Sequence, residues 1–209
     1  MARKPQLVIF LRAPQRGAVK RRLAREIGAR QAHAFYAGVS RDVVRRLAKG
    51  HRWHLSLAVT PDPLAARARF WPTPIPRLPQ GTGDLGHRMG RVFASLPPGP
   101  VVIVGTDIPG LSGRHIEQAF ATLRCNEAVF GPAADGGYWL IGLARRRLAP
   151  RPLASRLFRG VRWSTAHALD DTRTNLPKGA SGPLLARLED VDDAASWRRA
   201  QESADLPRF

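Results

Sequence analysis

Asp107 is the residue best placed to bind a metal ion. It stands in GTDIPGL, residues 105–111, directly after the apolar run VVIV. If that run is a buried strand, Asp107 lies at the carboxyl edge of a sheet, where open α/β proteins bind their ligands. A hard divalent cation takes oxygen ligands, often one or two carboxylates plus substrate phosphates. Capping a turn before Pro109 is the alternative role, and the position after the strand favours the metal.

A basic loop with the sequence RAPQRGAVKRRL, residues 12–23, follows the apolar run Leu7–Leu11. Gly17 exposes backbone N–H groups there, and Lys20 and Arg22 add positive charge near the expected start of a helix, which suits a phosphate. The loop lacks the second and third glycines of a dinucleotide fingerprint and is not a Walker A loop. An ordinary basic connector is an equally good interpretation.

Two further segments carry carboxylates. In GPAADGGYWLIG, residues 131–142, Gly136 and Gly137 allow close approach of a ligand beside Asp135. Tyr138 and Trp139 could stack on a base or sugar, although one of them must face the core if this is a strand. A plain Asp-Gly hairpin turn explains the pattern slightly better. In EDVDD, residues 189–193, the acidic side chains either cap a helix or supply a second carboxylate to a metal.

Other kinds of catalytic site find no support in the sequence. It contains no HExxH motif, no Ser-His-Asp order and no paired Cys-His spacing, and none of its 6 histidines has metal-ligand spacing. The single cysteine, Cys125, excludes an intrachain disulfide and indicates a reducing cytoplasm. We expect it to fill a small space in the core rather than act as a nucleophile.

Alternating strands and helices are predicted to position these motifs. The expected strands are Leu7–Leu11, Trp53–Thr60, Ile75–Leu78 at an edge, Val101–Val104, Ala128–Phe130, Tyr138–Leu143 and Leu184–Leu188. The expected helices run from Val19 to Gly28, from Gln31 to Ala48, from a cap at Asp84 to Leu96, from a cap at Ser112 to Leu123, from a cap at Ser164, and from Asp193 to Gln201. This order predicts an α/β fold, with a mostly parallel sheet covered on both faces, in one domain spanning 1–209.

Composition limits the partners. The chain has 209 residues, 44% of them hydrophobic, so it can form a sizeable core. No apolar run reaches the roughly 20 residues of a membrane helix, and no signal peptide is evident, so we expect a cytoplasmic protein. The net charge of +18 suggests an anionic partner. The arginines that carry most of this charge are scattered along the chain, which argues against nucleic acid as that partner.

Six blocks in series resemble the rSAM/selenodomain-associated transferase 1 family, which is similar to GT-A nucleotide-diphospho-sugar transferases. They are FLRAPQRGAVKRRL, QGTGDLGHRM, GTDIPGL, GPAADGGYWLIG, VRWST and DVDDAASW. The family is also related to molybdenum-cofactor and phospholactate guanylyltransferases. The resemblance implies a Rossmann-like three-layer α/β/α sandwich.

The resemblance also implies roles for single residues. Asp107 and Asp135 would be catalytic, and Asp107 with Asp192 would bind Mg²⁺ or Mn²⁺. The residues implied to bind nucleotide are Arg12, Gly17, Lys20, Arg22, Gln80, Gly81, Gly83, Asp84 and Arg88. Those implied to border the sugar or acceptor are Gly136, Gly137, Tyr138, Trp163 and Ser164. Asp107 lacks the full DxD pair of many GT-A enzymes because position 105 is glycine.

The resulting functional hypothesis is a metal-dependent glycosyltransferase with a nucleotide-diphospho-sugar donor and a small-molecule acceptor. The same loop and metal would serve a nucleotidyltransferase that takes a nucleoside triphosphate and releases pyrophosphate. A non-catalytic nucleotide or nucleic-acid binding protein is the third hypothesis, favoured by the net charge and by the incomplete DxD.

Overall fold

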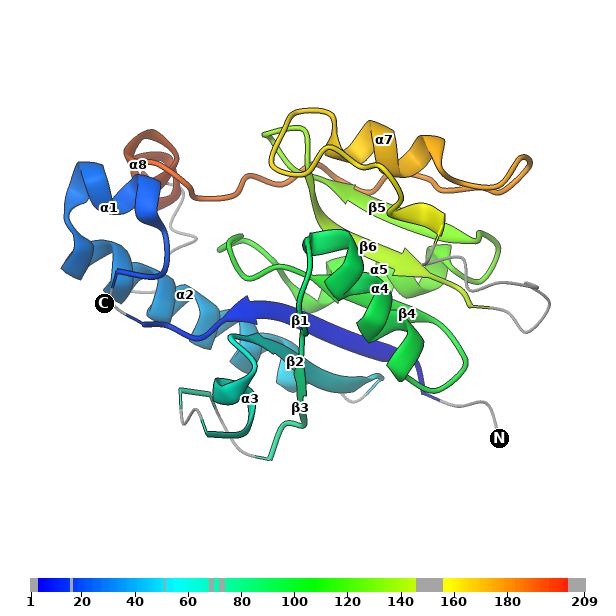
Figure 1. Ribbon diagram of the computed structural model, residues 1–209, viewed down its shortest axis with the longest axis horizontal. Helices are drawn as coiled ribbons and strands as arrows, with labels where there is room; N and C mark the ends of the chain where they lie inside the picture. The colour runs from blue at the N-terminus through cyan, green and yellow to red at the C-terminus, as the bar shows by residue number, and fades with distance from the viewer. Residues whose placement is uncertain are drawn as a thin grey trace.

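A six-stranded sheet forms the centre of the computed structural model, which describes residues 4–15, 17–50, 52–67, 70–71, 74–145 and 156–202. The strands lie in the order β3-β2-β1-β4-β6-β5 (Figure 1). Their bounds are β1 Gln6–Arg12, β2 His54–Thr60, β3 Arg77–Pro79, β4 Val101–Val104, β5 Ala128–Pro132 and β6 Tyr138–Leu143. The labelled helices are α1 Arg21–Ile27, α2 Ala29–Ala48, α3 Pro63–Arg67, α4 Leu85–Ser95, α5 Gly113–Thr122, α7 Ala168–Thr174 and α8 Ala194–Glu202.

The sheet is mostly parallel, as predicted. β1 pairs in parallel with β2 on one side and β4 on the other, and β3 extends this parallel part beyond β2. β6 is the exception, since it runs antiparallel to both β4 and β5. The carboxyl ends of β1, β2 and β4 therefore meet at one edge of the sheet.

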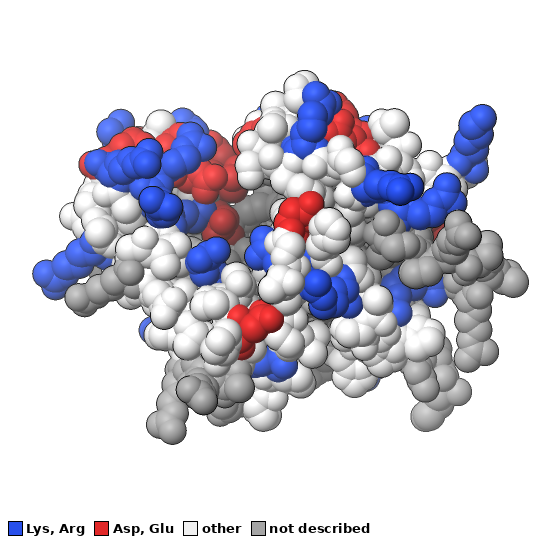
Figure 2. Space-filling view, viewed as in Figure 1, with Lys and Arg blue, Asp and Glu red and all other residues white. Residues whose placement is uncertain are grey.

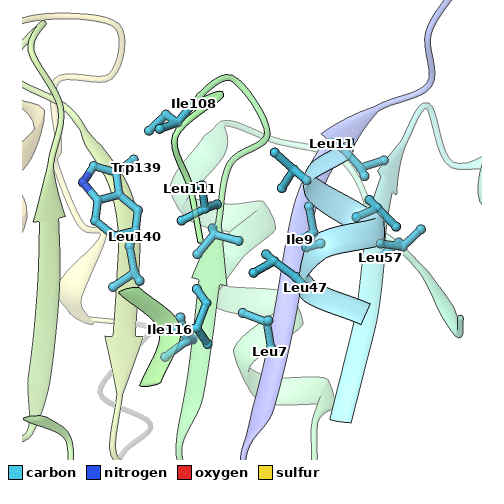
Figure 3. Packing of buried hydrophobic residues seen from close by; sticks show 14 of the residues in the cluster. Leu7, Ile9, Leu11, Leu47, Leu57, Ile108, Leu111, Ile116, Trp139 and Leu140 are labelled. Atoms are coloured by element: carbon cyan, nitrogen blue, oxygen red, sulfur yellow. The ribbon is translucent and has the colours of Figure 1, made fainter. Parts of the chain in front are cut away.

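Alternation along β1 divides the core into two layers. Leu7, Ile9 and Leu11 belong to one hydrophobic cluster, while Val8 belongs to a second one on the opposite face. Figure 3 shows the first cluster, in which side chains of β1, β2 and β6 pack with Leu47 of α2. Successive strand residues point to opposite faces, so the strand is buried on both sides.

Helices cover each face of the sheet. On the first face, α2 contributes buried side chains at the predicted four-residue spacing: Phe35, Val39, Val43 and Leu47. On the second face, the buried side chains of α4 are Met89, Val92 and Phe93, which pack with residues of the sheet and with Phe158. The three-layer α/β/α arrangement follows from these two clusters.

Two predicted elements were wrong in detail. The segment 184–188 is no strand: only Leu184 and Leu188 form bridges, to Phe130 in β5 and to Ala133 just after it. A register shift at Gly131/Pro132 lies between those two partners and interrupts the ladder. Ser164 does not cap a helix, because α7 begins only at Ala168, after a turn in which Ala168 N–H donates to the Thr165 carbonyl.

Cys125 was also misplaced. It is exposed in the turn that follows α5, because Leu123, two residues earlier, takes the buried position. Among the helices in the part of the chain that is described, none combines the length and the apolarity that a membrane span requires.

Candidate active site

An open cleft lies where β1 and β4 end and where α1 and α4 begin. Its volume is about 380 Å³. Its charged and polar lining side chains are Arg12, Lys20, Tyr36, Thr60, Gln80, Arg88, Thr106 and Asp107. Figure 2 shows a hollow on this face of the molecule, with basic and acidic side chains gathered at its rim. Five residues expected from the sequence to bind nucleotide or metal therefore share one cleft.

Lys20 joins the two carboxylates predicted to bind a metal. Its Nζ lies 2.9 Å from Asp107 Oδ2 and 2.6 Å from Asp192 Oδ1. The lysine side chain is only 6% exposed, whereas the carboxylate side chains are 44% and 41% exposed. Burial lowers the pKa of Lys20, but the two carboxylates outweigh this effect and raise the pKa above its ordinary value. The ammonium is therefore charged at neutral pH.

Backbone contacts bring Asp192 to Asp107 across a long separation in sequence. Val191 N–H donates to the Asp107 carbonyl at 3.0 Å, and the Val191 side chain is buried. The next residue, Asp192, thus emerges beside Asp107. Asp193 has a different task, since its carboxylate accepts from Ser196 N–H at 2.8 Å in the first turn of α8. The acidic segment EDVDD therefore caps a helix through Asp193, and it places the Asp192 carboxylate next to that of Asp107.

Two arginines, Arg12 and Arg88, also line the cleft, and Gln80 holds Arg88 in place. The Gln80 side chain is buried; its Nε2 donates to the carbonyls of Leu11 at 3.0 Å and Ala58 at 2.7 Å, and its Oε1 accepts from Arg88 at 2.9 Å. Burial and the neighbouring Arg12 both lower the pKa of Arg88. Among the described residues, the Arg12 guanidinium has no hydrogen bond or ion pair. Two cations facing each other in a cleft favour an anionic ligand.

Tyr36 is a cleft residue that was not predicted. Its hydroxyl accepts from Arg12 N–H at 2.9 Å and donates to the Arg12 carbonyl at 2.8 Å, which fixes the end of β1. Burial, helped by the charge of Asp107, raises the pKa of Tyr36, so the phenol stays neutral. Its place on α2, one residue after Phe35 and three before Val39, was the signal that it faces inward.

The other residues expected to bind nucleotide lie outside the cleft lining. Gly17 is exposed with φ +76°, and the exposed Arg22 approaches Asp193 at 3.9 Å. Gly81 N–H donates to Asp62, which fixes the loop before α4. Gly83 occupies that same loop with φ +97°, and Asp84 caps α4 by accepting from His87 N–H at 2.8 Å. Asp84 and its neighbours thus shape the start of α4, the helix that carries Arg88.

The glycine-rich turn between β5 and β6 contacts the segment that contains Trp163 and Ser164. Gly136 has φ +85°, and a Cβ there would collide with the backbone of Ala166. Leu169 N–H donates to the Gly136 carbonyl at 3.1 Å, while Asp135 accepts from Gly137 N–H at 2.8 Å. Only a glycine permits this approach, so the two predicted acceptor segments lie together.

Tyr138 and Trp163 pack into the second hydrophobic cluster. Their ring centroids lie 6.4 Å apart in an edge-to-face arrangement, and Phe130 and Phe158 extend the row. The Tyr138 hydroxyl and the Trp163 indole N–H are both buried without a hydrogen-bond partner among the described residues. Burial raises the pKa of Tyr138. Ser164, by contrast, is exposed with φ +60°.

The charge of Asp190 interacts both with the residues around Lys20 and with the glycine-rich turn between β5 and β6. Burial raises its pKa to about 6, and the charges of Asp192 and Asp135 add to the effect. The Asp190 charge therefore interacts with a carboxylate bound to Lys20 and with a carboxylate of the glycine-rich turn. The sequence contained a signal for it, since Asp190 and Asp192 flank the buried Val191 and so leave the chain beside the same site.

The carboxylates of Asp107 and Asp192 converge on one point, as the ligands of a divalent cation would. Each places an oxygen within 2.9 Å of the same point, the Lys20 nitrogen, and two converging carboxylates are a usual protein contribution to a Mg²⁺ site. The described part of the chain contains no group of three or more His, Cys, Asp or Glu side chains arranged for a metal. The remaining ligands would have to be water or substrate oxygens.

Known proteins with similar sequences or structures fall in one fold group. A family model described as "Uncharacterized protein conserved in bacteria (DUF2064)" matches residues 43–165. No curated protein matches the chain in sequence. A "putative nucleotide-diphospho-sugar transferase" from Desulfovibrio desulfuricans G20 is 25% identical, with a TM-score of 0.79 over 96% of this chain and 89% of that one.

Two more distant structures show the same fold. Rv0371c from Mycobacterium tuberculosis H37Rv, solved as a manganese complex, is 18% identical with a TM-score of 0.59, over 96% of this chain and 100% of that one. CMP:2-keto-3-deoxy-manno-octonic acid synthetase, solved with CTP, is 13% identical with a TM-score of 0.59, over 98% of this chain and 100% of that one.

Proposed function

Because the chain belongs to the DUF2064 family and shares the fold of a nucleotide-diphospho-sugar transferase, we propose that it is a metal-dependent transferase. The observation that carries the proposal is the convergence of Asp107 and Asp192 on Lys20, at a cleft that Arg12 and Arg88 also line. Carboxylates and guanidinium groups gathered around one cleft suit a diphosphate bound together with a cation.

The residues divide into two sets. Arg12, Lys20 and Arg88 would bind the phosphates, and Asp107 with Asp192 would hold Mg²⁺ or Mn²⁺. Such a cation, when bound, screens the diphosphate and stabilises the charge that develops on the leaving group. The manganese found with the fold relative Rv0371c is compatible with this assignment.

The acceptor would enter beside the glycine-rich turn. Asp135 lies in that turn, and the charge of Asp190 interacts with those of Asp135 and Asp192. With a pKa of about 6, Asp190 is suited to take a proton from an attacking hydroxyl. Gly136 and Gly137 would let a small-molecule acceptor approach the backbone closely, while Tyr138 and Trp163 would support the wall from the core.

Glycosyl transfer from a nucleotide sugar is our first assignment, because the relative at 25% identity carries that class in its name and the sequence blocks resemble the rSAM/selenodomain-associated transferases. Nucleotidyl transfer with release of pyrophosphate is the second. Three cations in one cleft also suit a triphosphate, and a synthetase solved with CTP has the same fold.

A thermal-shift screen followed by product analysis tests the proposal. The purified chain is heated with nucleoside diphosphates, nucleoside triphosphates and nucleotide sugars, each with Mn²⁺, Mg²⁺ or EDTA. A ligand of the folded state raises Tm by mass action. A metal-dependent shift with one nucleotide sugar, and release of its nucleoside diphosphate on turnover, supports glycosyl transfer. A shift restricted to triphosphates favours nucleotidyl transfer, and no shift with any of them contradicts both.

A further inference from the structure

The point between Asp107 and Asp192 holds the ammonium of Lys20. Both contacts are those of close ion pairs, at 2.9 and 2.6 Å, and the lysine side chain is nearly all buried. The same two carboxylates are the ones assigned to the cation under the proposed function, on which this inference rests. Lysine and metal therefore require the same oxygen atoms.

We propose that Lys20 is an exchangeable counter-ion that determines the order of binding. In the ligand-free chain its ammonium occupies the cation site. A divalent cation enters that site only when the ammonium moves to the phosphates of an incoming nucleotide. The lysine thus has two partners in succession, the carboxylates and then the phosphates.

Electrostatics makes the two occupants exclusive. A divalent cation held by the carboxylates of Asp107 and Asp192 would compete with the ammonium for the same oxygens, and the two like charges would repel. The ammonium cannot simply withdraw into the protein, because a buried charge without a partner costs several kcal/mol. It needs another anion.

Among the described residues that line the cleft, none besides Asp107 offers an anion to the ammonium; Asp190, whose charge interacts with Lys20, is not part of this lining. The other charged side chains of the lining are Arg12 and Arg88, which are cations themselves. A phosphate that binds these arginines would also offer oxygens to Lys20. Nucleotide binding would then release Asp107 and Asp192, so nucleotide and metal would each strengthen the binding of the other.

The exchange predicts that removal of the lysine opens the site to metal alone. The probe is Mn²⁺ titrated into the ligand-free chain, with free Mn²⁺ measured by electron paramagnetic resonance. Lys20→Met and Lys20→Gln should bind Mn²⁺ about tenfold or more tightly than the wild type, since each frees two carboxylates from a buried ion pair. Lys20→Gln keeps hydrogen-bond donors beside the carboxylates and guards against a folding defect in Lys20→Met.

Two controls distinguish the effect of freeing the two carboxylates from the effect of simply removing one positive charge. Arg25→Met removes one positive charge from the exposed surface of α1, the helix that begins just after Lys20, and should leave the Mn²⁺ affinity at the wild-type value. Adding Asp107→Asn to Lys20→Met should cancel the gain. The inference is overturned if both Lys20 variants bind Mn²⁺ no more tightly than the wild type, or if the gain survives Asp107→Asn.

A different result would show that the proposed function is wrong. In that case the wild type would bind none of ADP, CDP, GDP, UDP and dTDP in the presence of Mn²⁺. That result contradicts the transferase assignment and the movement of Lys20 to phosphates, whatever the Lys20 variants do with Mn²⁺ alone. Metal-dependent nucleotide binding in the wild type, without a gain in the Lys20 variants, overturns only the exchange.

Discussion

Replacement of Gln80 by leucine should weaken both the fold and the anion site. The side chain is 2% exposed, and the change removes its two donor contacts to the Leu11 and Ala58 carbonyls and its acceptor contact to Arg88. A neutral hydrogen bond contributes about 1 kcal/mol net and one to a charged group about 1.5–3 kcal/mol. We therefore expect Gln80→Leu to lower the free energy of unfolding by roughly 3–5 kcal/mol.

Urea denaturation followed by circular dichroism measures that loss. Gln118→Leu is the matched control, because Gln118 is exposed on α5 and its replacement should change the free energy of unfolding by no more than about 0.5 kcal/mol. A loss below about 1 kcal/mol for Gln80→Leu would refute the hydrogen-bond network described here.

A double-mutant cycle tests whether Gln80 acts through Arg88. Alone, Gln80→Leu should weaken nucleotide affinity by about three- to tenfold because Arg88 loses its orientation. In an Arg88→Met background the same change should weaken affinity by less than about twofold. Equal effects in both backgrounds would mean that Gln80 contacts the nucleotide directly, against the positioning role.

Three further changes test the loops around the site. Gly136→Ala should lower the free energy of unfolding by about 2 kcal/mol or more, through backbone strain and collision with Ala166. The control is Gly179→Ala, which has φ +80° but open space around it and should cost only about 1 kcal/mol. Equal losses for the two variants in urea denaturation would contradict the contact between Gly136 and Ala166. Asp84→Ala should cost about 1 kcal/mol by removing the cap of α4, and an unchanged urea midpoint would contradict that role. Hydrogen bonds from Arg162 lower the pKa of Asp171 from 3.8 to about 2, so this pair stabilises the fold above pH 3.8 and loses its effect as the pH falls towards 2. The difference between the urea midpoints of the wild type and Asp171→Asn should therefore be constant from pH 7 to 5 and shrink below pH 4. A difference that does not depend on pH would contradict the pair.

Much of the fold could be predicted because its signals are local. The apolar run of β1 and the four-residue spacing of α2 reflect periodic burial, and the caps at Asp84 and Ser112 were both found where helices begin. The segment 184–188 was predicted as a strand from its apolar residues. Whether it forms a ladder depends on a register shift in another strand, β5, which no local pattern reveals.

The sequence pointed to candidate residues for the site more readily than to the contacts between them. Asp107 and Lys20 could be found because each follows a strand that ends at the same edge of the sheet. The ion pair between Lys20 and Asp192 joins residues 172 positions apart, and it depends on the backbone bond from Val191 to Asp107. Tyr36 was missed because its hydroxyl bonds to the backbone of Arg12 at the end of β1, and no sequence motif marks such a contact.

The most direct test of the central claim is calorimetry of the wild type and Asp107→Asn with the nucleoside diphosphate that gives the largest thermal shift. With Mn²⁺ the wild type should bind it at least about tenfold more tightly than with EDTA, and Asp107→Asn should show the weaker affinity under both conditions, with an unchanged circular dichroism spectrum. Full affinity and full metal dependence in Asp107→Asn would contradict the assignment of Asp107 as the metal-binding carboxylate of a transferase.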